Sequence, residues 1–123
     1  MDESLDILER RNFIAGTDIF KEGDPGDVAY MVESGEVMIW HQAGDGQRQL
    51  GAVRDGGIFG EMALIDDQPR MATATAFTDT VCVAVPKDVF QKSLGQSSPF
   101  LVAILRVCVR NIRSMNRHRR RGD

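Results

Sequence analysis

The residues best suited to chemistry lie in one short segment of this 123-residue chain, residues 59–73. Gly57, Gly60 and the small Ala63 allow the backbone in and beside this segment to approach a ligand closely. Residues 60–65 are expected to form about one helical turn, whose first N–H groups point outward and favour a negative charge. The segment therefore has the features of a binding site for an anion.

Glu61 and Arg70 add charged side chains to this segment, on either side of the loop 66–69. The planar guanidinium of Arg70 can donate two hydrogen bonds at once to phosphate oxygens. Glu61 would repel an anion, so we expect it to accept a hydrogen bond from a nearby hydroxyl instead. A phosphate with a neighbouring hydroxyl is what a ribose phosphate offers. The alternative interpretation is an ordinary surface ion pair between the two side chains, worth about 0–1 kcal/mol.

The segment interrupts a series of short predicted strands, which must position it. Apolar runs recur about every ten residues between glycine-rich turns, a spacing typical of an antiparallel sandwich or barrel. Alternation within 73–76 predicts a strand with one solvated face, and the apolar run 81–85 predicts a strand covered on both faces. The expected strands are 19–20, 28–32, 37–40, 49–53, 72–77 and 81–85.

Helices are expected at both ends of the chain. Weak apolar periodicity predicts a short helix near residues 5–11, and residues 88–94 predict another after Pro86. A longer helix is expected to begin at 97–99, where serine and proline suit the first turn. We expect its apolar stripe to pack as core or lid and its arginine stripe to face solvent. The apolar stripe comprises Leu101, Ile104, Leu105, Cys108, Ile112 and Met115, and the arginine stripe comprises Arg106, Arg110, Arg113 and Arg117.

Length and composition indicate one ordinary domain without a targeting segment. The net charge of −3 argues against a general nucleic-acid binder, although seven arginines and a single acidic residue follow from Arg106 onward. Cys82 and Cys108 lack metal-ligand spacing and are expected to be free buried thiols. No apolar run approaches the ~20 residues of a transmembrane helix, so we expect a cytoplasmic protein with no transmembrane segment.

The residues Phe-Gly-Glu-Met-Ala-Leu-Ile, followed by Pro-Arg-Met-Ala-Thr, resemble the phosphate-binding cassette of cyclic-nucleotide-binding domains. That family includes the regulatory subunits of cyclic-AMP-dependent kinase and the catabolite activator protein. The resemblance runs over residues 15–116 and includes the turns at 23–27 and 34–36. It implies an α+β, mainly β fold: an antiparallel β-roll of the double-stranded jelly-roll type. We expect a short N-terminal helix, a one-turn cassette helix and two C-terminal helices around the roll.

The resemblance implies a role for each cassette position. Glu61 would accept a hydrogen bond from the ribose 2′-hydroxyl, and Arg70 would pair with the cyclic phosphate. The long C-terminal helix would swing over the base as a lid. Candidate base-capping residues on it are Arg113 and Asn116. The other expected ligand-binding residues are Gly60, Met62, Ala63, Met71 and Ala72.

Met71 departs from the family pattern, which usually has alanine, serine or threonine after the arginine. A hydroxyl there is associated in the family with the guanine form, so the resemblance implies that cyclic AMP is favoured over cyclic GMP. The ligand aside, no cofactor or metal is expected. The alternative is a cyclic-nucleotide-binding-like domain that serves as an interaction or scaffold module without a ligand.

The remaining expectations concern organisation and partners. We expect a binding domain over residues 1–116 and a basic C-terminal tail over 117–123. No Ser/His/Asp set, metal cluster or carboxylate pair suited to acid–base chemistry is evident, so the module is expected not to be an enzyme. A homodimer through the C-terminal helix is one expected assembly. This chain stops where a catabolite activator would begin its helix-turn-helix, so no direct DNA binding is expected of it.

Overall fold

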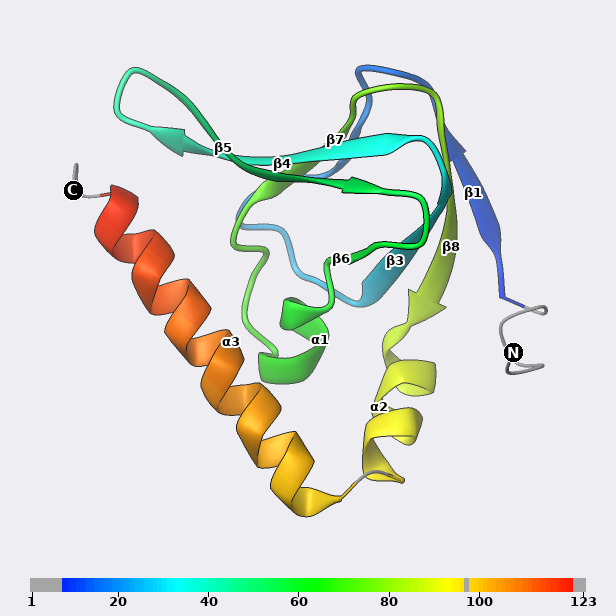
Figure 1. Cartoon of the computed structure of the whole chain (residues 1–123), viewed down its shortest axis with the longest axis vertical. Coiled ribbons are helices and arrows are strands. Elements are labelled where there is room, and N and C mark those ends of the chain that lie inside the picture. Colours follow the sequence, from blue (N-terminus) through cyan, green and yellow to red (C-terminus); the bar gives the residue numbers. More distant parts are fainter. Residues whose placement is uncertain (1–7, 97, 121–123) are drawn as a thin grey trace.

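A computed structural model describes residues 8–96 and 98–120. Short strands fill most of the chain and helices follow them (Figure 1). Glycine in the left-handed region ends or begins several strands, as at Gly35 between β3 and β4, where φ is 109°. The elements are β1 (Arg10–Phe13), β2 (Asp18–Phe20), β3 (Val28–Ser34), β4 (Glu36–Ala43), β5 (Gly46–Arg54), β6 (Ile58–Phe59), α1 (Met62–Asp66), β7 (Thr73–Ala76), β8 (Thr80–Pro86), α2 (Lys87–Gly95) and α3 (Pro99–Arg120).

The strands form two four-stranded antiparallel sheets. One has the order β1-β8-β3-β6, and the other has the order β2-β7-β4-β5. The chain passes from β6 in the first sheet to β7 in the second through residues 60–72, so the predicted ligand segment is a connection between the sheets. The antiparallel arrangement predicted from the turn spacing and the mainly β roll that the resemblance implies are both confirmed.

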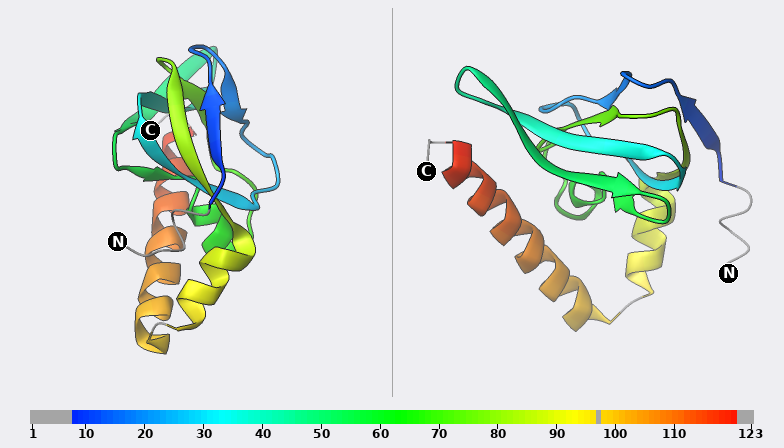
Figure 2. Two further views of the ribbon diagram at one scale, coloured as in Figure 1. Left: turned by 90° about the vertical axis from the view of Figure 1, so that its right-hand side faces the viewer. Right: turned by 45° about the horizontal axis from the view of Figure 1, so that its top comes forward.

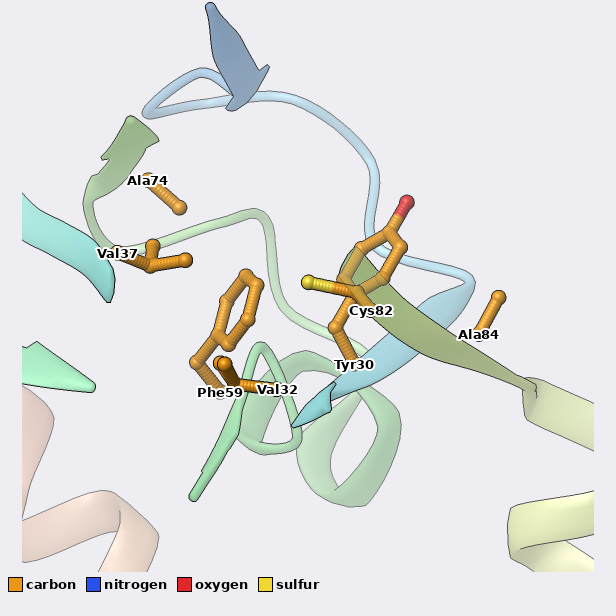
Figure 3. Packing of buried hydrophobic residues seen from close by; sticks show 7 residues of the cluster. All are labelled: Tyr30, Val32, Val37, Phe59, Ala74, Cys82 and Ala84. Atoms are coloured by element: carbon orange, nitrogen blue, oxygen red, sulfur yellow. The ribbon is translucent and has the colours of Figure 1, made fainter. Parts of the chain in front are cut away.

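The core lies between the two sheets, where alternate strand residues point inward (Figure 3). Tyr30 and Phe59 stack there with ring centroids 5.3 Å apart. The prediction that β8 is covered on both faces is confirmed at Cys82, Val83 and Ala84, which are all buried. Tyr30 and Phe59 share the core cluster with Val32, Val37, Ala74, Cys82 and Ala84.

Two local predictions need correction. Of the helix expected at 5–11, residues 5–7 lie outside the described residues, and residues 8–11 are not helical. Its last two residues belong to β1, because Arg10 pairs with Val83 and Arg11 with Cys82 of β8. The predicted solvated face of β7 is largely covered: Thr73 is buried and Thr75 is half-buried. Its Thr75 hydroxyl accepts a hydrogen bond from Trp40 Nε1 at 2.8 Å and donates one to an Asp18 carboxylate oxygen at 2.7 Å. A central strand thus covers its polar face with partners from both neighbours.

The three helices lie at one end of the roll, with α3 running toward the β4–β5 hairpin (Figures 1 and 2). The predicted helix after Pro86 is α2, and α3 continues to Arg120, beyond the expected end near Asn116. The apolar stripe of α3 that was predicted to pack is largely exposed, with exposed fractions from 39% at Ile112 to 57% at Met115, while Val109 is buried. Its last two residues, Ile112 and Met115, still line a cavity together with residues of β4 and β5. Arg113 belongs to the stripe predicted to face solvent and is also a candidate base-capping residue; it points toward the roll with 12% of its side chain exposed.

Candidate functional site

The cassette is formed by residues 60–72, and its geometry begins with a glycine. Gly60 has a φ of 78°, a conformation that L side chains rarely adopt, and it turns the chain from β6 into α1. The short helix ends at Asp67, which is also left-handed with a φ of 57°, and whose N–H bonds to the Ala63 carbonyl. These two turns fold the segment back on itself, so that Arg70 returns to the level of Gly60.

Arg70 is the central side chain of the site and is only 6% exposed. Its Nη1 donates to the Gly60 carbonyl at 2.7 Å and its Nη2 donates to the Val28 carbonyl at 2.6 Å. Its Nε is buried and has no hydrogen-bond partner in the described structure. Burial lowers the pKa of the guanidinium, while Tyr30, Asp27, Asp24 and Glu61 oppose that shift. A buried guanidinium with one N–H donor left without an acceptor is suited to bind an anion.

Small residues make room for this buried guanidinium. A Cβ atom at Gly26 would lie 2.4 Å from the Ala63 Cβ and 3.0 Å from the Arg70 Cζ. A Cβ atom at Gly60 would lie 2.7 Å from Arg70 Nη1. Gly26 was predicted only as a turn residue, so its close packing against Arg70 is a role that the sequence did not reveal.

Glu61 lies at the N-cap of α1, and its side chain makes no capping hydrogen bond. Burial raises the pKa of this carboxyl, whereas a hydrogen bond from its own backbone N–H and the charge of Arg70 lower it. Among the described residues Glu61 and Arg70 form no ion pair, so the alternative of an ordinary surface salt bridge does not describe this site. The carboxylate remains able to accept a hydrogen bond from a ligand hydroxyl.

One cavity of about 180 Å³ brings together every cassette residue selected from the sequence. Met71 lies on its wall beside Arg70, in the position where the family usually has a smaller residue. Arg113 of α3 also lines it, whereas the side chain of Asn116 lies outside the described residues. The lining residues are Phe20, Ile39, Val53, Ile58, Phe59, Gly60, Glu61, Met62, Ala63, Arg70, Met71, Ala72 and Arg113.

Sequence reasoning also missed two residues that contact the arginines of this site. Phe20 of β2 lies under the Arg70 guanidinium, with Cζ 4.0 Å from the ring centroid. Asp66 of α1 binds the Arg113 guanidinium, with Nε 2.6 Å from Oδ2. Phe20 appeared in the sequence only as part of a strand, and Asp66 only as part of a loop. Each gains its role from a residue more than forty positions away, which no local spacing indicates.

Residues 8–96 and 98–120 contain no group of three or more His, Cys, Asp or Glu side chains placed to hold a metal ion. They also contain no helix with the length and hydropathy needed to cross a lipid bilayer.

Comparison with known proteins decides the family. Residues 10–97 match the family model of the cyclic nucleotide-binding domain. This chain belongs to the cyclic nucleotide-binding domain family. The domain is 41% identical over 90 residues to a cAMP-dependent protein kinase regulatory subunit of Colletotrichum orbiculare, covering 73% of this chain and 22% of that subunit. This cyclic nucleotide-binding domain therefore spans about a fifth of the curated relative.

Solved structures agree with this assignment. The cAMP-bound form of the EAL enzyme Bd1971 has a TM-score of 0.84 and 32% identity, over 88% of this chain and 29% of that one. The catabolite activator protein of Thermus thermophilus has a TM-score of 0.72 and 30% identity, over 94% of this chain and 55% of that one. The fold of this cyclic nucleotide-binding domain is thus shared with a cAMP-bound protein and with a catabolite activator.

Proposed function

We propose that this domain binds a cyclic nucleotide, with the phosphate at Arg70 and the ribose 2′-hydroxyl at Glu61. The observation that carries the proposal is the buried Arg70 guanidinium, whose Nε has no partner and whose side chain lines a cavity together with Glu61. An entering phosphate would give that buried donor an acceptor, and charge-assisted hydrogen bonds of this kind are the strong ones. The cAMP-bound form of the EAL enzyme Bd1971 supports the same ligand class.

The favoured ligand is cyclic AMP rather than cyclic GMP. Met71 lies on the cavity wall next to Arg70, and a thioether offers no hydroxyl to a guanine edge. A site that hydrogen-bonds a polar group of its ligand strongly rejects a similar ligand that lacks this group, whereas an apolar wall distinguishes the two ligands only weakly. We therefore expect a modest preference for cyclic AMP, without strong exclusion of cyclic GMP.

The output of binding is movement of α3 and not a chemical reaction. Arg113 of α3 lines the cavity. A ligand bound in the cavity would therefore affect the position of α3, and the position of α3 would affect how the ligand binds. A ligand that favours one position of α3 shifts the population toward it. The relatives named as kinase regulatory subunits and as a catabolite activator support a regulatory, non-catalytic role.

The exposed stripe of α3 is proposed to pair with the same stripe of a second copy. Leu101, Leu105 and Cys108 lie on the outward face of the helix, and Leu101 and Leu105 are 54% and 40% exposed. Apolar residues spaced three and four apart on an exposed helix favour helix–helix packing. Sedimentation of the wild type and of Leu105→Glu tests this, and a wild type that stays monomeric at high micromolar concentration would refute it. Direct DNA binding by this chain is not proposed, and a cytoplasmic setting stays a prediction.

Titration calorimetry with cyclic AMP and cyclic GMP tests the main proposal. We expect binding by the wild type and a loss of about 10- to 100-fold in Arg70→Ala, since a hydrogen bond to a charged group is worth about 1.5–3 kcal/mol. Arg54→Ala is the matched control, because Arg54 is 77% exposed and pairs with Glu36 outside the cavity. Melting of each free variant separates lost binding from lost folding.

The alternative of a scaffold module without ligand predicts a different result. In that case neither nucleotide at millimolar concentration would produce heat or raise the melting temperature of the wild type. The proposal would then be wrong, whatever the behaviour of the variants.

A further inference from the structure

The helix α3 is held to the rest of the described fold by few contacts. It spans 22 residues, yet Val109 is its one buried residue among those whose side chains are described. Within the same part of the chain, every hydrogen bond from an α3 side chain to another element comes from Arg113. Among the described side chains of α3, Arg113 therefore makes the polar contacts that fix the helix against the roll.

Arg113 uses its whole guanidinium fork on the cassette. Nε donates to Asp66 Oδ2 at 2.6 Å and Nη2 donates to Asp66 Oδ1 at 3.2 Å. Nη1 donates to the Pro69 carbonyl at 3.0 Å, immediately before Arg70. The two paired side chains are only 12% and 20% exposed, so solvent screens this pair less than it screens a surface salt bridge. Bidentate geometry also fixes the direction from which α3 approaches.

The carboxylates of the cassette have separate partners. Asp67 pairs with Lys87 at the start of α2, while Asp66 pairs with Arg113 of α3. These adjacent acidic residues thus connect α1 to two different helices. Of these two ion pairs, only that of Asp66 joins the cassette to α3.

The docked position of α3 completes the cavity walls. Arg113 lines the cavity of about 180 Å³ beside Arg70, and Ile112 and Met115 line an adjoining cavity of about 330 Å³. The two cavities share Ile39, Val53 and Met71 on their walls. Ligand sites for small molecules commonly measure about 300–1,000 Å³, so the smaller cavity alone is small for a nucleotide. The walls of this larger space thus include Arg113, Ile112 and Met115 of α3 in its docked position.

We infer that Asp66 is a positioning residue, which holds α3 against the cassette through Arg113 and thereby sets how tightly the site binds its nucleotide. The inferred effect of Asp66 on nucleotide affinity rests on the proposed function, whereas its inferred effect on the position of α3 does not. Only the docked fraction has the complete site, and the apparent affinity falls in proportion to that fraction. Breaking the Asp66–Arg113 pair therefore weakens binding without removing any group that touches the phosphate.

The chain supplies its own probe for the position of α3. Trp40 is the only tryptophan, and its Nε1 is fixed by the Thr75 hydroxyl. Cys108 is exposed on α3, whereas Cys82 is buried and its pKa is raised to about 11. At concentrations at which the chain is monomeric, a thiol-reactive acceptor dye at neutral pH will therefore label Cys108, and energy transfer from Trp40 within one chain reports the distance between the roll and α3.

The experiment compares Asp66→Asn with Asp67→Asn in the full labelled chain. Without nucleotide, we expect energy transfer to fall in Asp66→Asn and to stay at the wild-type level in Asp67→Asn, which loses the same charge one residue away. With cyclic AMP, the affinity of Asp66→Asn should drop about fivefold or more, in the range of typical coupling between sites. The swapped double variant, Asp66→Arg with Arg113→Asp, should recover part of both signals.

The outcomes separate the inference from the proposed function. Unchanged energy transfer in nucleotide-free Asp66→Asn overturns the inference even if cyclic AMP binds. Reduced energy transfer with unchanged cyclic AMP affinity also overturns it, because α3 would then move without affecting the site. Reduced energy transfer in a protein whose wild type binds no cyclic nucleotide leaves the role of Asp66 in placing α3 supported and refutes the proposed function alone.

Discussion

The guanidinium of Arg70 lies over the ring of Phe20, with its Cζ atom 4.0 Å from the ring centroid. Strand β2 thus supports the cation of the site from below, while Gly60 and Val28 hold its Nη atoms. A desolvated cation–π contact is worth about 2 kcal/mol and an exposed one about 0.5–1 kcal/mol. Phe20 is therefore part of the site, although it does not belong to the cassette.

We predict that Phe20→Leu keeps the fold and weakens cyclic AMP binding by about 3- to 30-fold, the range that corresponds to the loss of a cation–π contact. Leucine fills much of the same space but offers no ring face to Arg70. Titration calorimetry provides the measurement. Phe77→Leu is the control, because Phe77 is 57% exposed in a loop and should bind like the wild type. Equal affinity in the two variants would contradict a role for Phe20.

Gly60→Ala should lower the free energy of unfolding by about 1–3 kcal/mol and displace Arg70. The backbone there has a φ of 78°, and an added Cβ would lie 2.7 Å from Arg70 Nη1. Urea unfolding measures the stability. Gly44→Ala is a matched control, since Gly44 has a φ of 58° with nothing within 4 Å of an added Cβ. If Gly60→Ala and Gly44→Ala lose the same small amount of unfolding free energy, crowding of Arg70 by the added Cβ does not contribute.

Glu61→Gln should stabilise the free protein at pH 7 and weaken nucleotide binding. Burial raises the pKa of Glu61 above its ordinary value of 4.5, so the folded state binds the proton more tightly than the unfolded state does. Stability therefore falls as the pH rises from that ordinary value through the raised one, and the loss persists at neutral pH. Glutamine removes this penalty, so the melting temperature of Glu61→Gln at pH 7 should exceed that of the wild type.

The stabilising effect of Glu61→Gln should disappear below about pH 4, where the carboxyl is protonated in both states. Melting curves recorded between pH 3 and pH 7, at intervals of ~0.5 pH units, measure this stability difference between Glu61→Gln and the wild type. Glu33→Gln serves as the control, because Glu33 is an exposed residue paired with Arg10 on the surface. A stability difference independent of pH would mean that the buried charge is not its cause.

Met71→Thr should narrow the preference for cyclic AMP over cyclic GMP. Met71 lines the cavity beside Arg70, and threonine would place a hydroxyl and a smaller side chain on that wall. One neutral hydrogen bond contributes about 0.5–1.5 kcal/mol, so we expect the affinity for cyclic GMP to rise by about 2- to 10-fold. Competition between the two nucleotides measures the ratio. An unchanged ratio would exclude Met71 as a determinant of nucleotide choice.

The two cysteines should differ sharply in reactivity. Burial raises the pKa of Cys82 to about 11, so its thiolate is scarce at neutral pH, whereas Cys108 is exposed on α3. A chromogenic disulfide reagent should modify one thiol per folded chain rapidly and the second only on unfolding. Cys108→Ser should abolish the rapid phase. Two rapid thiols in the wild type would show that β8 opens readily.

The strands and the cassette were predictable because their signals are local. Glycine turns mark the ends of the strands, and Gly60, Glu61 and Arg70 are recognised by residue type and spacing within one short segment. The side chains that the spacing selected do line one cavity. Residues that contribute through space, such as Phe20, have no such signal in the sequence.

The orientation of α3 could not be predicted from its own sequence. An apolar stripe ordinarily packs inward, but here Arg113 turns toward Asp66, which lies 47 positions away in the chain. Long-range hydrogen bonds also explain why the threonine face of β7 is largely covered. Thr73 accepts a hydrogen bond from the Glu22 N–H, and Thr75 bonds to Trp40 and Asp18 on the neighbouring strands. Long-range polar partners overrode the local pattern in both cases.

The position of the cassette between β6 and β7 has a mechanical consequence. Strand β6 belongs to one sheet and β7 to the other, and the cavity is lined by Phe59 of the first and by Phe20 and Ile39 of the second. A ligand held there would work as a cross-brace between the two sheets. Ligand binding should therefore slow amide hydrogen exchange in both sheets, including strands that do not contact the ligand.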